Sequence, residues 1–131
     1  MRSQAREAVF KFIFSQLFNP DDEGLFTVLC KELNDDDKSF AQQLLSNIDE
    51  NKESYLSVIE ELAIGYKLNR LFATDKCALL IGIAELNAFQ ETPVAVVIDQ
   101  AVTLAGKYST DNSTGFVNGL LGEYVRSKQN G

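Results

Sequence analysis

The amino-acid sequence predicts an all-α protein, and three observations support this prediction. Apolar side chains recur every three to four residues over most of the chain, which is the spacing of one face of an α-helix. Prolines occur only at positions 20 and 93, and no segment shows the sustained apolar–polar alternation of a half-buried strand. Apolar residues make up 45% of the 131 residues, enough for the sizeable core of one domain.

Four helices are expected in the N-terminal half. The first is amphipathic and ends at Asn19-Pro20, because a residue before proline disfavours helical geometry. The acidic residues at 21–23 favour the start of a second helix, since a helix N-terminus carries positive partial charge. The polar segments NDDD and DENKE precede the third and fourth helices. We expect these four helices at about 3–18, 22–33, 36–49 and 51–64.

Three longer helices are expected in the C-terminal half, after a short helical turn at about 67–76. The segment DKCALLIGIAELNAF is apolar nearly all round, so its helix should be buried. Glu85 within it must then lie near an exposed end or pair with a basic residue. Thr92-Pro93 begins the next helix, with Thr as N-cap and Pro at the first helical position. The three helices are expected at about 75–89, 93–108 and 113–127.

The segment NSTGFVNGLL, residues 112–121, contains an Asn-Gly pair of the kind that is common in hairpin turns. Apolar residues nevertheless recur at helical spacing from Phe116 onward, and no strand pattern flanks the pair. We therefore predict that Gly119 lies inside a helix, where glycine costs about 0.5–1 kcal/mol relative to alanine. We favour close approach of a neighbouring helix as the reason for this glycine. Room for a ligand beside Asn118 is the alternative.

Composition excludes several functional classes. The chain has no histidine, which removes histidine acid–base catalysis, Ser-His and Cys-His nucleophile pairs and histidine-containing metal sites. Cys30 and Cys77 lie far apart among apolar neighbours, as expected of buried, reduced thiols rather than of a zinc site. No GxGxxG or GxxxxGK[ST] pattern occurs, so we expect no phosphate-binding glycine loop and no cofactor.

The chain also lacks the usual signals for membranes and secretion. No apolar run reaches the roughly 18 residues of a membrane span. The charged N-terminus MRSQAREAVFKFIF has neither the continuous apolar region nor the cleavage site of a secretion signal. We therefore expect a cytoplasmic protein without membrane contact.

The net charge of −7 is unevenly distributed along the chain. Residues 1–18 carry +2, residues 19–62 carry −9 from twelve acids and three lysines, and residues 63–131 are neutral. The acidic runs most simply cap helices and solvate outer faces. An acidic protein is a poor general polyanion binder, so a nucleic-acid contact would have to use the basic N-terminus and the neutral C-terminal half.

Five segments, in order and at matching spacings, resemble the NusB family of transcription antitermination proteins over nearly the whole chain. They are AREAVFKFIF (5–14), YKLNRLFATDKCALL (66–80), AEL (84–86), TPVAVVIDQAVTLAGKY (92–108) and NSTGFVNGLL (112–121). The resemblance implies a single NusB-like domain of about seven helices in two packed subbundles, about 1–64 and 65–131. It also implies a protein without enzymatic activity that binds boxA RNA together with the ribosomal protein NusE, within an antitermination complex on RNA polymerase.

The resemblance assigns roles to individual residues. Arg2 and Arg6 fill the family's basic N-terminal segment, which contacts RNA. Phe116 matches an aromatic position implicated in RNA contact, where stacking on a base is expected, beside a helix start whose free N–H groups favour phosphate. Asn112 replaces a usual Asp, and the loss of negative charge should favour RNA. The candidate RNA-binding residues are Arg2, Arg6, Asn112, Ser113, Phe116 and Asn118.

Two acidic residues are the candidate contacts of the protein partner. Asp75 matches an acidic position on the NusE side of the family's proteins. Leu80 stands where the family usually has Arg, which leaves Glu85 without its usual local partner. We therefore count Glu85 with Asp75 among the candidate NusE contacts.

Other interpretations stay open at this point. The chain could be an acidic helical protein–protein interaction module without an RNA role, which would dock through its acidic middle. A similar helical domain precedes the catalytic domain of some ribosomal RNA cytosine methyltransferases, but this chain offers no cofactor-binding loop. Phe116 as a plain core residue, and the two arginines as an ordinary solvated N-terminus, are the structural alternatives. Monomer and homodimer are both open, since the family contains both.

Overall fold

The structure is a computed structural model that describes residues 2–20, 22, 24–63 and 71–130. Across these residues it is built from six α-helices and contains no strand, which confirms the predicted all-α class. The helices are α1 (Arg2–Gln16), α2 (Leu25–Leu29), α3 (Asp35–Leu62), α4 (Ala73–Ala88), α5 (Val94–Tyr108) and α6 (Asp111–Asn130).

The N-terminal half differs from the prediction in two ways. The helices expected at about 36–49 and 51–64 are one continuous helix, α3, of 28 residues. The intervening DENKE segment contains no Gly or Pro, and Ile48 and Tyr55 on either side of it are both buried, so the inward-facing stripe continues through it. The helix expected at about 22–33 is only the five-residue α2. Of the helical turn expected at about 67–76, residues 67–70 lie outside the described residues, Leu71 and Phe72 are not helical, and α4 begins at Ala73.

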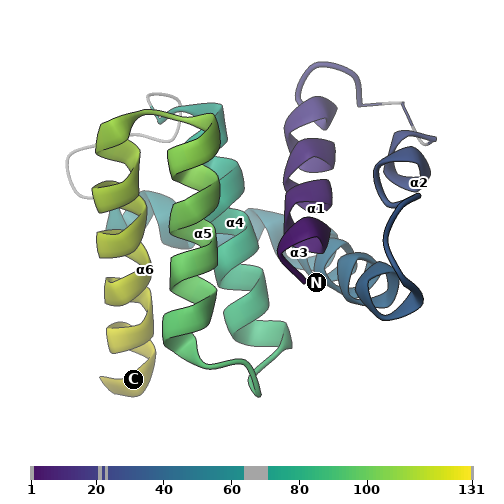
Figure 1. Ribbon diagram of the computed structural model, residues 1–131. Helices are drawn as coiled ribbons and strands as arrows, with labels where there is room; N and C mark the ends of the chain where they lie inside the picture. The colour runs from purple at the N-terminus through teal and green to yellow at the C-terminus, as the bar shows by residue number, and fades with distance from the viewer. Residues whose placement is uncertain (1, 21, 23, 64–70, 131) are drawn as a thin grey trace.

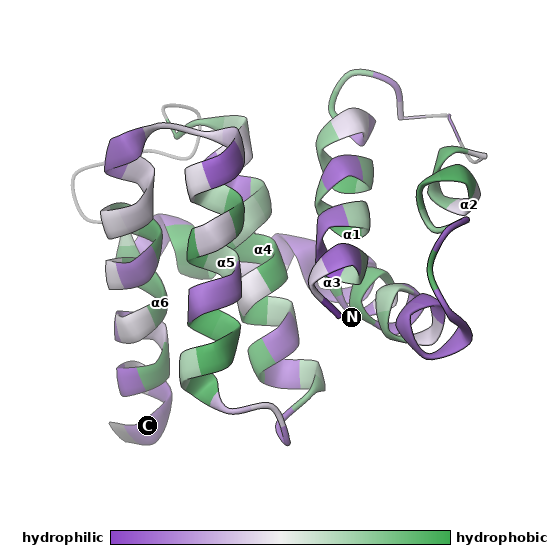
Figure 2. Cartoon of the chain, viewed as in Figure 1, coloured by the Kyte–Doolittle hydropathy of each residue, from purple (hydrophilic) through white to green (hydrophobic). Residues whose placement is uncertain are grey.

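The helices form two groups joined by α3 (Figure 1). Helices α4, α5 and α6 pack side by side, α1 packs on α2 and α4 and contacts α5, and α3 runs behind and packs on α1, α4 and α6. Hydrophobic and hydrophilic residues alternate along α5 and α6, as in amphipathic helices (Figure 2). The division into subbundles at about residue 64 stays a prediction, because α3 packs on helices of both groups.

Helix α4 is the centre of the core, as its nearly uniform apolar sequence predicts. Every residue from Cys77 to Glu85 is buried. Gly82 allows the neighbouring helices to approach closely, since an added Cβ would lie 2.7 Å from Leu121 Cδ1 and 3.3 Å from Ala101 Cβ. In the part of the chain that the structure describes, no helix is long and apolar enough to cross a bilayer.

The glycine of NSTGFVNGLL is not explained by helix packing. Gly119 lies inside α6, as predicted, but nothing lies within 4 Å of a Cβ built on it. The expected close approach of a neighbouring helix is therefore wrong at this position. The physical reason is that α6 buries the face that carries Val117, Leu121 and Tyr124, whereas position 119 points to the opposite side.

Candidate functional site

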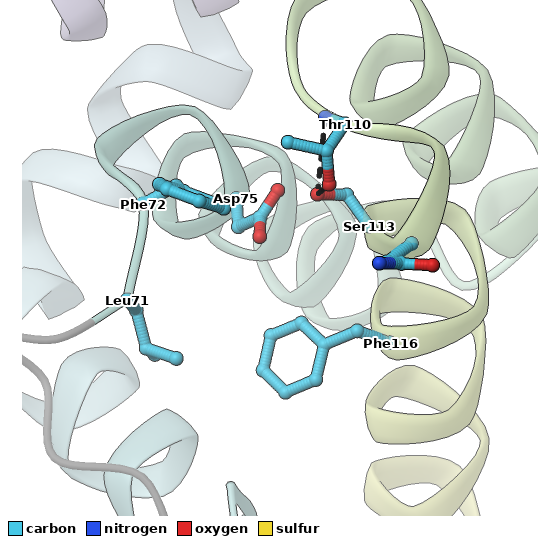
Figure 3. A pocket seen from close by; sticks show the side chains of 7 residues that line it. Leu71, Phe72, Asp75, Thr110, Ser113 and Phe116 are labelled. Carbon is cyan, nitrogen blue, oxygen red and sulfur yellow. Dashed lines mark hydrogen bonds between the residues drawn. The ribbon is translucent and has the colours of Figure 1, made fainter.

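A cavity of about 340 Å³ lies where the start of α4 faces the start of α6 (Figure 3). Seven residues from these two elements and the segments before them line it: Leu71, Phe72, Asp75, Thr110, Asn112, Ser113 and Phe116. The cavity therefore brings three of the candidate RNA-binding residues together with one candidate NusE contact. No single segment of the sequence contains this combination, because it depends on how α4 and α6 pack.

Asp75 places an unpaired carboxylate in this cavity. Its side chain points into the space between α4 and α6 (Figure 3), and the residue is only 5% exposed. Among the described residues, its Oδ1 atom has no hydrogen-bond partner. The first turn of α4, where Asp75 lies, favours negative charge, but a buried unpaired carboxylate oxygen still costs free energy. The cavity thus offers a hydrogen-bond acceptor that a ligand's donor can satisfy.

Ser113 lines the cavity but its hydroxyl serves the fold. The residue is 2% exposed, and its hydroxyl donates to Ser109 Oγ at 2.9 Å. The same oxygen accepts from the Thr110 backbone N–H, and the two hydroxyls of Thr110 and Ser113 lie 3.0 Å apart. Ser113 therefore closes the turn between α5 and α6 and does not open a helix toward phosphate as expected. The helix starts two residues earlier, and Asp111 in its first turn, together with Asp75, makes this end unfavourable for an anion.

Asn112 and Phe116 are the two RNA candidates that a ligand in the cavity can reach. Asn112 is exposed at the rim. Phe116 is half-buried: it packs against the core, and its ring also points into the cavity (Figure 3). One part of the Phe116 side chain thus belongs to the core, and another part can contact a ligand in the cavity.

Asn118 is not part of the cavity. It is exposed and lines a separate groove of about 600 Å³ between α5 and α6. Residues two positions apart on a helix point about 200° apart, so Asn118 faces away from Phe116. The expectation that these two residues contact the same ligand is therefore not met in this structure.

Arg6 and Glu85 bind each other in the interior. Arg6 Nε donates to Glu85 Oε1 and Arg6 Nη2 to Glu85 Oε2, each at 2.6 Å, with exposures of 5% and 0% for the two residues. Of the two alternatives for Glu85, the structure shows the pairing with a basic residue. The assignments of Arg6 to RNA and of Glu85 to NusE stay predictions, although the pairing holds both side chains in the interior. The reason for the pairing is that a carboxylate buried on α4 needs a counter-charge, and α1 supplies it from a position remote in sequence.

Arg2 keeps its charge at the surface. Its guanidinium carbon lies 4.6 Å from the centre of the Phe40 ring and 5.7 Å from that of Phe89. These two rings contact each other, with centroids 4.6 Å apart, so Arg2 rests on an aromatic pair. Of the two arginines expected to contact RNA, only Arg2 is exposed.

A polar contact between α1 and α5 has no signal in the sequence. Glu7 Oε2 accepts hydrogen bonds from Lys107 Nζ and, at 2.8 Å, from the Tyr108 hydroxyl. The Lys107 hydrogen bond is the main reason that the pKa of Glu7 lies below its ordinary value of 4.5. Tyr108 also stacks on Phe10, with ring centroids 4.8 Å apart. The contact joins residues 100 positions apart, so local patterns could not reveal it.

Three exposed apolar side chains form a second feature that the sequence did not reveal. Phe18 is 74% exposed, Phe72 57% and Leu17 49%. Leu17 lines a small cavity together with Ala73, which follows Phe72 in the chain, Phe72 lines the cavity with Asp75, and Phe18 contacts Phe14. We call Leu17, Phe18 and Phe72 the apolar patch. Exposed side chains of this size often mark a protein interface.

The cysteines show no sign of a reactive or metal-binding role. Cys30 and Cys77 are both buried and free, and burial raises the pKa of the Cys77 thiol to about 12. A thiol with such a pKa is inert at neutral pH. Within the described ranges, no group of three or more Cys, Asp or Glu side chains is arranged to hold a metal ion.

Comparison with known proteins identifies the family. A model of the NusB family matches residues 3–126. The chain belongs to the NusB family. Two relatives, each named transcription antitermination protein NusB, match almost end to end. The Finegoldia magna protein is 31% identical over 98% of this chain and 96% of the relative. The Streptomyces avermitilis protein is 36% identical over 95% and 93%.

Solved structures of the NusB family share the fold. A T. maritima NusB structure matches with a TM-score of 0.86 and 31% identity over 94% of this chain and 89% of that one. A crystal structure of antitermination factors NusB and NusE in complex with dsRNA matches with a TM-score of 0.85 and 26% identity over 96% of both chains. The likeness covers nearly the whole chain.

Proposed function

We propose that the protein is a transcription antitermination factor without catalytic activity, which binds boxA-type RNA together with the ribosomal protein NusE. The observation that carries the proposal is its NusB-family match over residues 3–126, together with the likeness to the NusB–NusE complex with dsRNA. In this role it joins the antitermination complex on RNA polymerase and works in the cytoplasm, where transcripts are made.

The RNA side of the proposed site consists of Arg2, Asn112 and Phe116. The Phe116 ring offers a stacking face for a base, the Asn112 amide offers a polar contact at the rim, and Arg2 offers a positive charge near the N-terminus. Because one exposed arginine on a protein of net charge −7 provides little attraction for phosphates, binding to RNA alone should be weak.

The partner side consists of the apolar patch and Asp75. Docking of NusE on the patch would remove its apolar side chains from water. A basic NusE side chain that reaches into the cavity would satisfy Asp75 Oδ1, which has no hydrogen-bond partner among the described residues. Phe72 and Asp75 line the same cavity as Asn112 and Phe116, so the partner and the RNA would meet there and strengthen each other's binding.

Titration of boxA RNA with and without NusE tests this function. We expect weak, salt-sensitive binding by the protein alone, and tighter binding with NusE that favours boxA over a scrambled sequence. A gel-shift series with no boxA preference in the presence of NusE would contradict the proposal.

Two asparagines on α6 provide a matched pair of variants for the same titration. Asn112→Asp adds a negative charge at the cavity rim and should weaken RNA binding about fivefold, an effect that grows at low salt. Asn118→Asp adds the same charge on the groove between α5 and α6 and should leave RNA binding unchanged. Equal effects of the two variants would argue against the cavity as the RNA site.

The apolar patch is also consistent with a helical interaction module that has no RNA role. This second function predicts that reversing the charge of Arg2 (Arg2→Glu) leaves all binding untouched. The proposed function predicts that Arg2→Glu weakens boxA binding and spares NusE binding, so the two are distinguished by measuring both partners.

A further inference from the structure

We propose that a groove along α3 binds single-stranded RNA that continues beyond the boxA element, with Arg2 at one end and Lys128 at the other. The groove has a volume of about 440 Å³ and is lined by Gln42, Gln43, Ser46, Asn47, Glu50 and Ala88. The inference rests on the proposed function, because it extends the RNA path from Arg2 onto a surface that the candidate residues above do not include.

The acidic residues of the chain avoid this groove over most of its length. Residues 19–62 contain twelve acids, yet the window 38–48 contains none and carries one lysine. Glu50 is the single acid among the residues that line the groove. An RNA strand can therefore approach here without the repulsion that it would meet at either end of α3.

The lining groups are suited to the edges of bases. The Tyr55 hydroxyl donates to Asn47 Oδ1 at 2.6 Å, which holds the Asn47 amide in place and leaves its NH₂ group as a donor. Gln43 Nε2 donates to Ser39 Oγ at 2.9 Å, which leaves the Gln43 carbonyl oxygen as an acceptor. Amide side chains with one fixed end present a donor or an acceptor to an unpaired base at little further cost in entropy.

Positive side chains stand at both ends of the groove. At one end Arg2 rests on Phe40 and Phe89, and Phe89 directly follows the lining residue Ala88. At the other end Lys128 donates to Asn87 Oδ1, and the Asn87 side chain contacts the same Tyr55 hydroxyl that holds Asn47. The Phe40-to-Asn47 stretch of α3 spans about 10 Å at 1.5 Å per residue, so the two cations bracket a short stretch of RNA.

A protein segment fits this surface less well than RNA. The exposed large apolar side chains of the described residues are Leu17, Phe18, Val28, Phe72, Val94 and Val96, and none of them lines the groove. Protein interfaces usually depend on buried apolar or aromatic anchors, which this groove cannot supply.

The test compares three RNAs bound to the complex of the full protein with NusE: a minimal boxA RNA, and the same RNA extended by about six nucleotides on the 5′ or the 3′ side. Fluorescence anisotropy should show that one extended RNA binds about three- to tenfold more tightly than the minimal RNA. Lys128→Glu and Gln43→Glu should each remove this gain and leave binding of the minimal RNA unchanged. Lys128→Ala should lower the salt slope for the extended RNA by about 0.7, the loss of one phosphate contact.

Lys31→Glu is the matched control, because it makes the same charge change on the surface beside α2. It should preserve the gain. Equal binding of all three RNAs, or a gain that survives Lys128→Glu, would overturn the inference while the proposed function stands. Failure to bind even the minimal boxA RNA would overturn both. A loss of NusE binding in Lys128→Glu without RNA would assign the groove to a protein partner and likewise overturn the inference.

Discussion

Two regions of the molecule use the same residue types with opposite results. One is the packed core around α4, which we call the seam. The other is the open end of the molecule at the start of α6. In the seam, the buried carboxylate of Glu85 is held by both nitrogens of the Arg6 fork, whereas at the open end Asp75 Oδ1 is buried and unpaired. Gly82 in the seam is in close contact with its neighbours, whereas Gly119 on α6 faces open space.

This difference separates residues that maintain the fold from residues that are available to a ligand. Glu85 and Gly82 have their packing and hydrogen-bonding partners within the chain, so changing them should alter stability. Asp75 lacks such a partner among the described residues, so changing it should alter binding more than stability. The predictions below test this division.

Breaking the Arg6–Glu85 pair should have the largest effect. Arg6→Ala leaves an uncompensated carboxylate in the interior and should lower the free energy of unfolding by about 3–5 kcal/mol. Chemical denaturation measures this. The double variant Arg6→Met with Glu85→Leu should recover most of the loss, because an apolar pair needs no counter-charge. A small effect of Arg6→Ala alone would mean that the pair is not structural.

Asp75→Asn should reduce NusE binding by about 1.5–3 kcal/mol, the usual range for a hydrogen bond to a charged group. It should leave stability unchanged or slightly raised, because the buried oxygen has no partner in the part of the chain that the structure describes. Calorimetric titration with NusE and a thermal melt measure the two quantities. Asp99→Asn, at an exposed residue of α5, is the control. Loss of stability in Asp75→Asn would show that this carboxylate belongs to the fold.

The two glycines should respond in opposite directions to alanine. Gly82→Ala places a methyl group 2.7 Å from Leu121 Cδ1, and such overpacking typically costs about 1–3 kcal/mol. In Gly119→Ala the added methyl group has nothing within 4 Å, so the variant should stabilise α6 by about 0.5–1 kcal/mol. Denaturation of both variants tests the comparison, and destabilisation by Gly119→Ala would refute it.

The smallest effect concerns Glu7 and pH. The folded-state pKa of Glu7 is below 4.5, mainly because of the Lys107 hydrogen bond, so its contribution to stability is present above pH 4.5 and is lost as pH falls through the lowered pKa. Lys107→Ala should slightly reduce stability at neutral pH and make no difference at about pH 2. Denaturation at both pH values measures this, with Lys31→Ala as control. An equal loss at both values would point to packing instead.

Local patterns predicted the fold class and most helix ends, but residues that act through packing could not be placed. The DENKE segment does not end α3, because it contains no Gly or Pro and the buried stripe continues through it, whereas the NDDD segment begins this helix as predicted. The partner of Glu85 is 79 residues away in the chain, and no local spacing indicates Arg6 over another arginine. The cavity with Asp75 and Phe116 likewise requires α4 and α6 to be placed first.

One difference from the prediction could have been found in the sequence. Helical geometry alone puts Phe116 and Asn118 about 200° apart on α6, so the predicted helix already indicates that the two side chains do not line one cavity. The acid-free window 38–48 is also visible in the sequence, although only the structure shows that it lines a groove.

The Arg6–Glu85 pair also has a consequence for the way the protein is made. Arg6 leaves the ribosome 79 residues ahead of its partner, and at about 5–20 residues per second the delay is about 4–16 s. During this time α1 has its arginine but not the carboxylate on α4 that pairs with it. The N-terminal helix is therefore expected to dock late during synthesis, and nascent chains that stop before residue 85 should expose α1 to proteases and chaperones.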